Sequence, residues 1–150
     1  MDEGANIETS EVLEAAVDSA DLSILRFLLE TSPSIRIYGS ADLKRAIRSE
    51  AVELVEFLIQ QGIDVNDLDR TQTPLQSAVP NIILQKILLR AGADVNYPGF
   101  WDSERTALQE ACWKGSLESI NLLLSAGADV NVPACYKNGW DCPSGRGASR

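Results

Sequence analysis

The sequence predicts an all-α solenoid built from about four helix–loop–helix repeats. The turn Gly-Ala-Asp-Val-Asn occurs at residues 92–96 and again at 127–131, and Gly-Ile-Asp-Val-Asn occurs at 62–66. A leucine-rich segment precedes each turn, and a Leu-x-x-Ala signal lies upstream of each segment. Because these signals recur in the same order about every 33 residues, we expect a stack of similar units, each of which buries one face against the next.

The first helix of each unit is expected to begin at a hydroxyl residue and to carry the Leu-x-x-Ala signal. A Ser or Thr at this place accepts a hydrogen bond from an unpaired N–H of the first helical turn. Pro74 is suited to the first helical position, where its missing N–H costs nothing. The predicted caps are Ser10, Ser40, Thr73 and Thr106, and the signals are Leu13/Ala16, Leu43/Ala46, Leu75/Ala78 and Leu108/Ala111.

The second helix of each unit is expected to bury a stripe of leucines and to end at a glycine. Leucines at three- and four-residue spacing, Leu88 and Leu123 among them, predict the stripe. Gly92 and Gly127 should have positive φ, because the chain leaves a helix most easily through a left-handed residue. Asp94 and Asp129 are interpreted as turn residues rather than as a row of catalytic acids or metal ligands. Val95 and Val130 are expected to pack beneath the turns.

Two motifs in the right order resemble the ankyrin repeat. They are Thr-Pro-Leu-Gln-x-Ala at 73–78 and Leu-Leu-x-x-Gly-Ala-Asp-Val-Asn at 88–96, and the following unit repeats both with one change, at 106–111 and 123–131. The resemblance covers residues 10–131 and implies that β-hairpin-like fingers project from one edge of the stack. Gln76 and Gln109 stand where the family usually has His, and we expect them to bond to Thr73 and Thr106.

The organisation expected along the chain is an extension, an array and a tail. Residues 1–9 form the extension and residues 10–134 the array, with units one to four at about 10–34, 35–66, 67–96 and 97–131. Residues 131–140 align with 96–105, so a fifth unit begins with its finger. Residues 135–150 are then predicted to be this truncated finger and a disordered tail, because Gly, Ser and Pro dominate the end.

The composition argues against several classes of function. A net charge of −9 argues against nucleic acid, and no apolar run approaches the roughly 20 residues that a bilayer span needs. His is absent, which removes the commonest general base and zinc ligand. Cys112, Cys135 and Cys142 form no zinc motif, and Cys112 is expected to be a buried thiol. We therefore predict no enzyme, no metal and no cofactor, and an intracellular protein of the cytoplasm or nucleus.

The resemblance implies that the chain binds another protein through its concave face. In ankyrin arrays this face consists of the ends of the first helices and of the fingers. Trp113 is the leading candidate, because an exposed Trp in a groove is a common interface anchor. Carried over to this sequence, the helix positions are Asp18, Ser19, Arg48, Ser49, Trp113 and Lys114, and the finger positions are Arg70, Gln72, Phe100, Trp101, Asp102, Arg105, Tyr136 and Trp140. For Phe100 and Trp101, stacking on the next finger is an equal alternative.

Other functions stay open at this point. The chain is a protein-binding module, a small inhibitor of an enzyme, a remnant of a longer array without its own partner or, least favoured, an enzyme that uses the row of Asp residues. Unit four does not have the polar outward face of a closing unit, since it carries Leu108, Leu117 and Leu124. We expect its C-terminal side to expose an apolar patch that favours self-association over cover by the tail or by a partner.

Overall fold

The computed structural model describes residues 15–19, 21–31, 39–66, 72–97 and 105–132. Residues 15–19 are helical, and Gln72 forms an isolated β-bridge. No strand occurs in these ranges, which confirms the all-α prediction. Most of each finger lies outside them. The helices that follow residue 19 are α2 (Leu22–Thr31), α3 (Gly39–Arg48), α4 (Val52–Gln60), α5 (Pro74–Ser77), α6 (Ile82–Arg90), α7 (Ala107–Lys114) and α8 (Leu117–Ser125).

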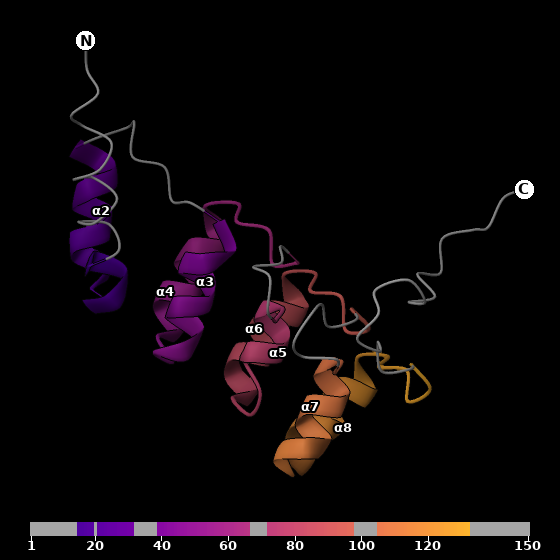
Figure 1. Cartoon of the computed structure of the whole chain (residues 1–150). Coiled ribbons are helices and arrows are strands. Elements are labelled where there is room, and N and C mark those ends of the chain that lie inside the picture. Colours follow the sequence, from indigo (N-terminus) through magenta and orange to yellow (C-terminus); the bar gives the residue numbers. More distant parts are fainter. Residues whose placement is uncertain (1–14, 20, 32–38, 67–71, 98–104, 133–150) are drawn as a thin grey trace, which may run out of the picture.

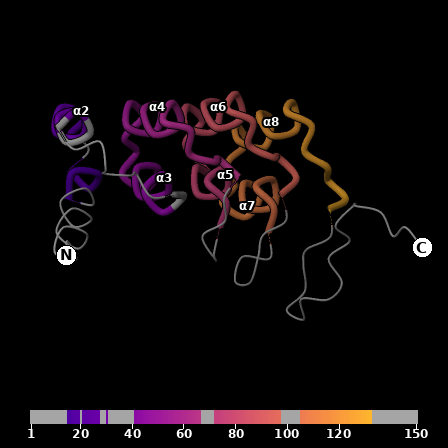
Figure 2. Tube along the Cα trace, turned by 90° about the horizontal axis from the view of Figure 1, so that it is seen from above, coloured from indigo at the N-terminus to yellow at the C-terminus, as the bar shows by residue number. Residues whose placement is uncertain are grey.

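The helices form two parallel rows. One row contains the second helices α2, α4, α6 and α8, and the other contains the first helices α3, α5 and α7 (Figure 2). Successive pairs are displaced like steps from the indigo end to the orange end (Figure 1). From α3 to α8, the two helices of each unit contact each other, and equivalent helices of neighbouring units contact each other as well. The architecture is therefore the predicted solenoid.

The core runs along the whole stack between the two rows. Leu88 and Leu123 are completely buried, as predicted from the leucine stripe. The alanines of the Leu-x-x-Ala signals are buried as well, and their small side chains allow adjacent first helices to approach closely. These alanines are Ala16, Ala46, Ala78 and Ala111.

Two of the predicted helix caps form complete capping boxes. Thr73 Oγ1 accepts from the Gln76 N–H at 3.1 Å, and Gln76 Oε1 accepts from the Thr73 N–H at 2.7 Å. Thr106 and Gln109 repeat the arrangement at 3.3 and 2.9 Å. The cap predicted at Ser40 is wrong, because α3 already begins at Gly39 and Ser40 is its second residue. Ser10 lies outside the described residues.

The glycines that end the second helices have the predicted left-handed conformation. Gly92 has φ +92° and Gly127 has φ +91°. After α6 the Gly92 N–H bonds to Leu89 O at 3.1 Å, and the Ala93 N–H bonds to Leu88 O at 3.0 Å. These two bonds satisfy carbonyls that the helix end would otherwise leave unpaired.

Asparagine side chains join each of these turns to the next unit. Asn66 donates through Nδ2 to Gly92 O at 3.0 Å and accepts through Oδ1 from the Asp94 N–H at 2.7 Å. Asn96 makes the same pair of bonds to Gly127 O at 3.1 Å and to the Asp129 N–H at 2.7 Å. We call this series the asparagine ladder. It was not anticipated from the sequence.

The row of aspartates closes the turns locally. Asp94 Oδ1 accepts from the Asn96 N–H at 2.9 Å, and Asp64 and Asp129 make the equivalent bond at 2.8 Å. No group of three His, Cys, Asp or Glu side chains among the described residues is arranged to hold a metal ion. The interpretation of these aspartates as turn residues is supported.

Two burial predictions are wrong. Cys112 is exposed, because the small buried position belongs to Ala111 and the next residue points about 100° further round the helix. Val130 is 69% exposed, whereas its equivalents Val65 and Val95 are buried and half-buried. A described unit follows each of those valines in the stack, whereas no described helix follows Val130.

Candidate protein-binding face

Trp113 is held in the last turn of α7 with its ring outside the core. Leu108 and Ala111 use the opposite side of the helix to pack inward, which leaves Trp113 66% exposed. The guanidinium of Arg105 lies 4.6 Å from the centroid of the ring. A cation over an aromatic face is attractive, by about 0.5–1 kcal/mol at an exposed site. The ring therefore has a fixed neighbour while most of its surface faces solvent.

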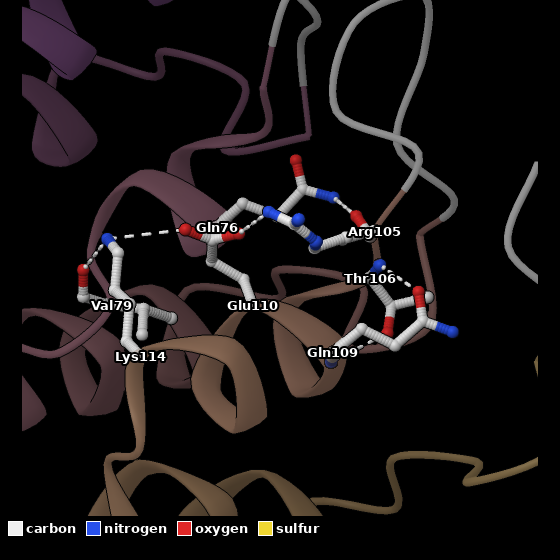
Figure 3. A network of polar contacts seen from close by, with 7 residues as sticks. All are labelled: Gln76, Val79, Arg105, Thr106, Gln109, Glu110 and Lys114. Atoms are coloured by element: carbon white, nitrogen blue, oxygen red, sulfur yellow. Dashed lines mark hydrogen bonds and ion pairs between the residues drawn. The ribbon is translucent and has the colours of Figure 1, made fainter.

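Glu110 connects the charged residues around Trp113. Its side chain is only 7% exposed and lies between two cations. Glu110 Oε2 is 3.4 Å from Arg105 Nη1, and Glu110 Oε1 is 3.5 Å from Lys114 Nζ (Figure 3). Since a buried carboxylate is costly unless it is paired, these contacts constrain both cations. We call Arg105, Glu110, Trp113 and Lys114 the Trp113 cluster.

Hydrogen bonds to unit three hold the Trp113 cluster in place. Lys114 Nζ donates to Val79 O, in the turn after α5, at 2.7 Å, and Gln76 Nε2 donates to Arg105 O at 2.7 Å (Figure 3). Gln109 repeats the second contact one unit later, with Nε2 donating to Val132 O at 2.9 Å. Both cationic residues of the cluster therefore bond to unit three, Lys114 through its side chain and Arg105 through its backbone carbonyl.

The other predicted helix positions lie on the first helices of units one and two. Arg48 is exposed at the end of α3, and Ser49 Oγ donates to Ala46 O at 3.1 Å. Ser19 makes the equivalent bond to Ala16 O at 2.9 Å, and Asp18 pairs with Arg45 at 3.2 Å. Within the described ranges none of these residues contacts the Trp113 cluster.

The predicted finger positions are described only in part. Gln72 is half-buried just before the Thr73 cap, and Arg105 belongs to the Trp113 cluster. The remaining finger positions lie outside the described residues: Arg70, Phe100, Trp101, Asp102, Tyr136 and Trp140.

Arg105, Trp113 and Lys114 were predicted from the sequence as candidate binding residues, but the parts played by Glu110 and Val79 were not predicted. The spacing of Glu110 and Lys114, four residues apart on one helix, was a usable signal for their contact. No sequence signal pointed to Val79, because it takes part through its backbone carbonyl alone.

The other row of helices has a shallow groove between α6 and α8. Its volume is about 310 Å³. Lys86, Leu89 and Arg90 line it from α6, and Leu122 and Ser125 of α8 line it together with Ala126, the residue after α8. This groove shows which sides of the two helices face each other.

Comparison with known proteins identifies the family. A family model of three ankyrin repeats matches residues 43–134, which is more than half of the chain. The chain belongs to the ankyrin repeat family, whose repeats generally serve as protein–protein interaction modules. A putative ankyrin repeat protein of fowlpox virus (strain NVSL) is 34% identical over 79 residues, which cover 51% of this chain and 15% of that protein. The chain thus corresponds to a small part of that relative's length. None of the helices described here is long and apolar enough to cross a membrane.

Proposed function

We propose that this chain binds a partner protein through a concave face centred on the Trp113 cluster and performs no chemistry of its own. The observation that carries the proposal is Trp113, which is 66% exposed although it lies in a well-packed helix and under a fixed guanidinium. Trp and Arg are the residues most enriched at the energetic centres of interfaces. A rigid anchor also loses little side-chain entropy on binding.

The chemistry of the face favours a partner with an apolar or aromatic side chain beside an acidic group. The exposed indole offers the apolar contact. Arg105 and Lys114 keep some N–H groups for a partner, because the single carboxylate of Glu110 is shared between them. Arg48 and Ser49 would extend the face along the stack, and Arg70, Gln72, Phe100, Trp101 and Asp102 would extend it along the fingers. We place the protein inside the cell, in the cytoplasm or nucleus.

Affinity capture from lysate of the source cell tests this proposal. The baits are wild type, Trp113→Ala and, as a matched control, Ile83→Ala, which truncates an apolar side chain exposed on the opposite row in α6. We expect a partner that wild type and Ile83→Ala retain and Trp113→Ala loses. With the purified partner, Trp113→Ala should weaken Kd about 30-fold or more, the range of an interface hot spot.

The same experiment separates the alternatives. If circular dichroism shows Trp113→Ala to be folded and it keeps every wild-type partner, the assignment of the face is wrong. A captured enzyme whose activity falls on binding would identify the chain as an inhibitor. A capture with no specific partner would favour the remnant of a longer array.

A second candidate function is self-association through the C-terminal side of α8. Leu117 is 73% exposed, and Leu124 and Val130 are exposed as well. We call these three residues the C-terminal face. In units two and three their equivalents are half-buried or buried under the next unit: Val52, Ile59 and Val65 in unit two, and Ile82, Leu89 and Val95 in unit three. Exposed apolar patches of this kind mark association sites.

Light scattering at rising concentration tests the second candidate, with Leu117→Glu as the variant. The apparent mass of wild type should rise above 16.3 kDa, and that of Leu117→Glu should rise less. A wild type that stays monomeric at the highest concentration would end this candidate without affecting the first.

A further inference from the structure

The groove between α6 and α8 lies on the row of second helices, whereas Trp113 belongs to α7 in the other row (Figure 2). Its volume of about 310 Å³ is at the lower limit of small-molecule sites, which range from about 300 to 1,000 Å³. Leu89 and Leu122 are half-buried and give the groove its apolar lining. A groove this small and shallow suits a side chain of a partner protein better than an enclosed ligand.

Two cations stand beside this apolar lining. Lys86 and Arg90 are exposed and lie four residues apart on α6, which is about 6 Å along the helix axis at 1.5 Å per residue. Among the described residues neither of them makes an ion pair, although the chain has 22 acidic residues for 13 basic ones. α6 itself has no acidic residue. Both charges are therefore available to a partner.

The stacking of units does not require a cation at either place. Aligned on the glycine after each second helix, the same two positions in units two and four are acidic or neutral, and those units form the same helix pairs. The cations are thus a property of unit three alone. The equivalents are Glu56 and Asn121 for Lys86, and Gln60 and Ser125 for Arg90.

We propose that this groove binds an acidic amphipathic helix of a partner protein, with its carboxylates on Lys86 and Arg90 and a leucine-like side chain between α6 and α8. Acids four residues apart on the partner helix have the same rise of about 6 Å as the two cations. A helix that lays its apolar stripe into a groove is a recurring mode of peptide recognition. The groove shares no residue with the Trp113 cluster, so the two surfaces bind independently.

An extended polyanion fits the groove less well than a short acidic helix. Anionic membranes and nucleic acids are bound by larger clusters of Lys and Arg, and a net charge of −9 repels a broad negative surface. A helix with a few acids meets Lys86 and Arg90 at contact distance, where the attraction is strongest. Its apolar side chain adds a contact with Leu89 and Leu122 that does not depend on charge.

An NMR titration of the isotope-labelled chain with a model helix tests this inference. The probe is an Ala-rich peptide of about 16 residues, long enough to form a helix, that carries Glu-Ala-Ala-Leu-Glu twice. A matched peptide has Gln in place of each Glu. The acidic peptide should shift the amide signals of α6 and α8 and leave those of α7 unchanged. The Gln peptide should bind about fivefold more weakly, because both exposed ion pairs are lost.

Variants of the chain locate the site. Lys86→Gln and Arg90→Gln should each weaken Kd for the acidic peptide about two- to fivefold, the range for one exposed ion pair. Arg48→Gln is the matched control, because it removes an exposed cation at the end of α3 and changes the net charge equally. Arg48→Gln and Trp113→Ala should both bind the peptide like wild type.

Four results would overturn the inference. They are the absence of binding, equal binding of the Gln peptide, an equal loss in Arg48→Gln, and signal shifts centred on α7, which would assign the peptide to the Trp113 cluster. Phosphatidylserine vesicles are the comparison for a lipid partner. If the chain binds them through Lys86 and Arg90 more tightly than it binds the peptide, the groove recognises a membrane surface and the proposed partner is wrong. A normal titration of Trp113→Ala keeps this test separate from the function proposed for Trp113.

Discussion

At Gly92 the cost of a substitution comes from the backbone conformation alone. Its φ is +92°, and a Cβ added there would have no atom within 4 Å. Gly92→Val should therefore destabilise through conformation alone, by about 1–2 kcal/mol more than Gly92→Asn, since Asn tolerates left-handed φ far better. Urea unfolding measures both variants. Equal losses would show that the conformation of this residue does not limit stability.

Glu50 occupies the left-handed position at the end of α3. It has φ +55°, whereas Gly115 stands with φ +69° at the equivalent end of α7. The Glu50 N–H bonds to Ile47 O at 3.0 Å, and the Ala51 N–H bonds to Ala46 O at 3.1 Å. These bonds satisfy carbonyls at the end of the helix, but glutamate is an unfavourable residue for a left-handed conformation.

Glu50→Gly should therefore raise the free energy of unfolding by about 1 kcal/mol, because glycine relieves the left-handed strain. A matched control is Glu53→Gly, an exposed change within α4 that should lower it by about 1 kcal/mol. Thermal and urea unfolding of the two variants should shift in opposite directions. A loss of stability in Glu50→Gly would mean that the Glu50 side chain contributes more than its backbone costs.

At the scale of whole elements, helix ends followed rules that act within a few residues. Thr73 and Thr106 cap α5 and α7 together with a Gln three residues later, and Pro74 occupies the first helical position. The contacts between units did not follow from such local rules. Asn66 and Asn96 reach across 26 to 33 residues of sequence, and no local rule indicates such a partner.

The asparagine ladder should contribute measurably to the stacking of units. Asn96→Ala removes two side-chain bonds between units three and four and should cost about 1–2 kcal/mol, at roughly 1 kcal/mol net for each bond. Asn131→Ala is the matched control, because its amide has no described partner, and it should cost less than about 0.5 kcal/mol. Chemical denaturation compares the pair. Similar losses in both would show that the ladder adds nothing to stability.

At the scale of the whole molecule, the net charge of −9 opposes association between copies. The C-terminal face proposed for self-association is apolar, so salt should strengthen the association by screening the repulsion. The Debye length falls from about 30 Å at 0.01 M to about 8 Å at 0.15 M ionic strength. Sedimentation equilibrium should therefore show tighter association at 0.15 M than at 0.01 M. Association that weakens as salt rises would indicate an interface held by charge, and would contradict association through the apolar C-terminal face.

The repeat, its period and the local geometry of most helix ends could all be predicted from the sequence. A glycine after a leucine-rich segment and a Thr-x-x-Gln box have the same physical consequence in any context, because their hydrogen bonds close within one turn. Ankyrin-type stacking followed from the recurrence of both signals. The cap rule failed at Ser40, which is the second residue of α3, and no sequence signal indicated the left-handed conformation of Glu50.

The tertiary structure decided which residues meet. Glu110 is buried between Arg105 and Lys114, both of which also bond to unit three. Lys44 is buried in the place that Gln76 and Gln109 occupy in their units. Cys112 and Val130 were assigned to the core from position alone, whereas the neighbouring unit decides whether a position is covered. Burial and pairing depend on surfaces brought together across tens of residues, and one unit's sequence does not contain that information.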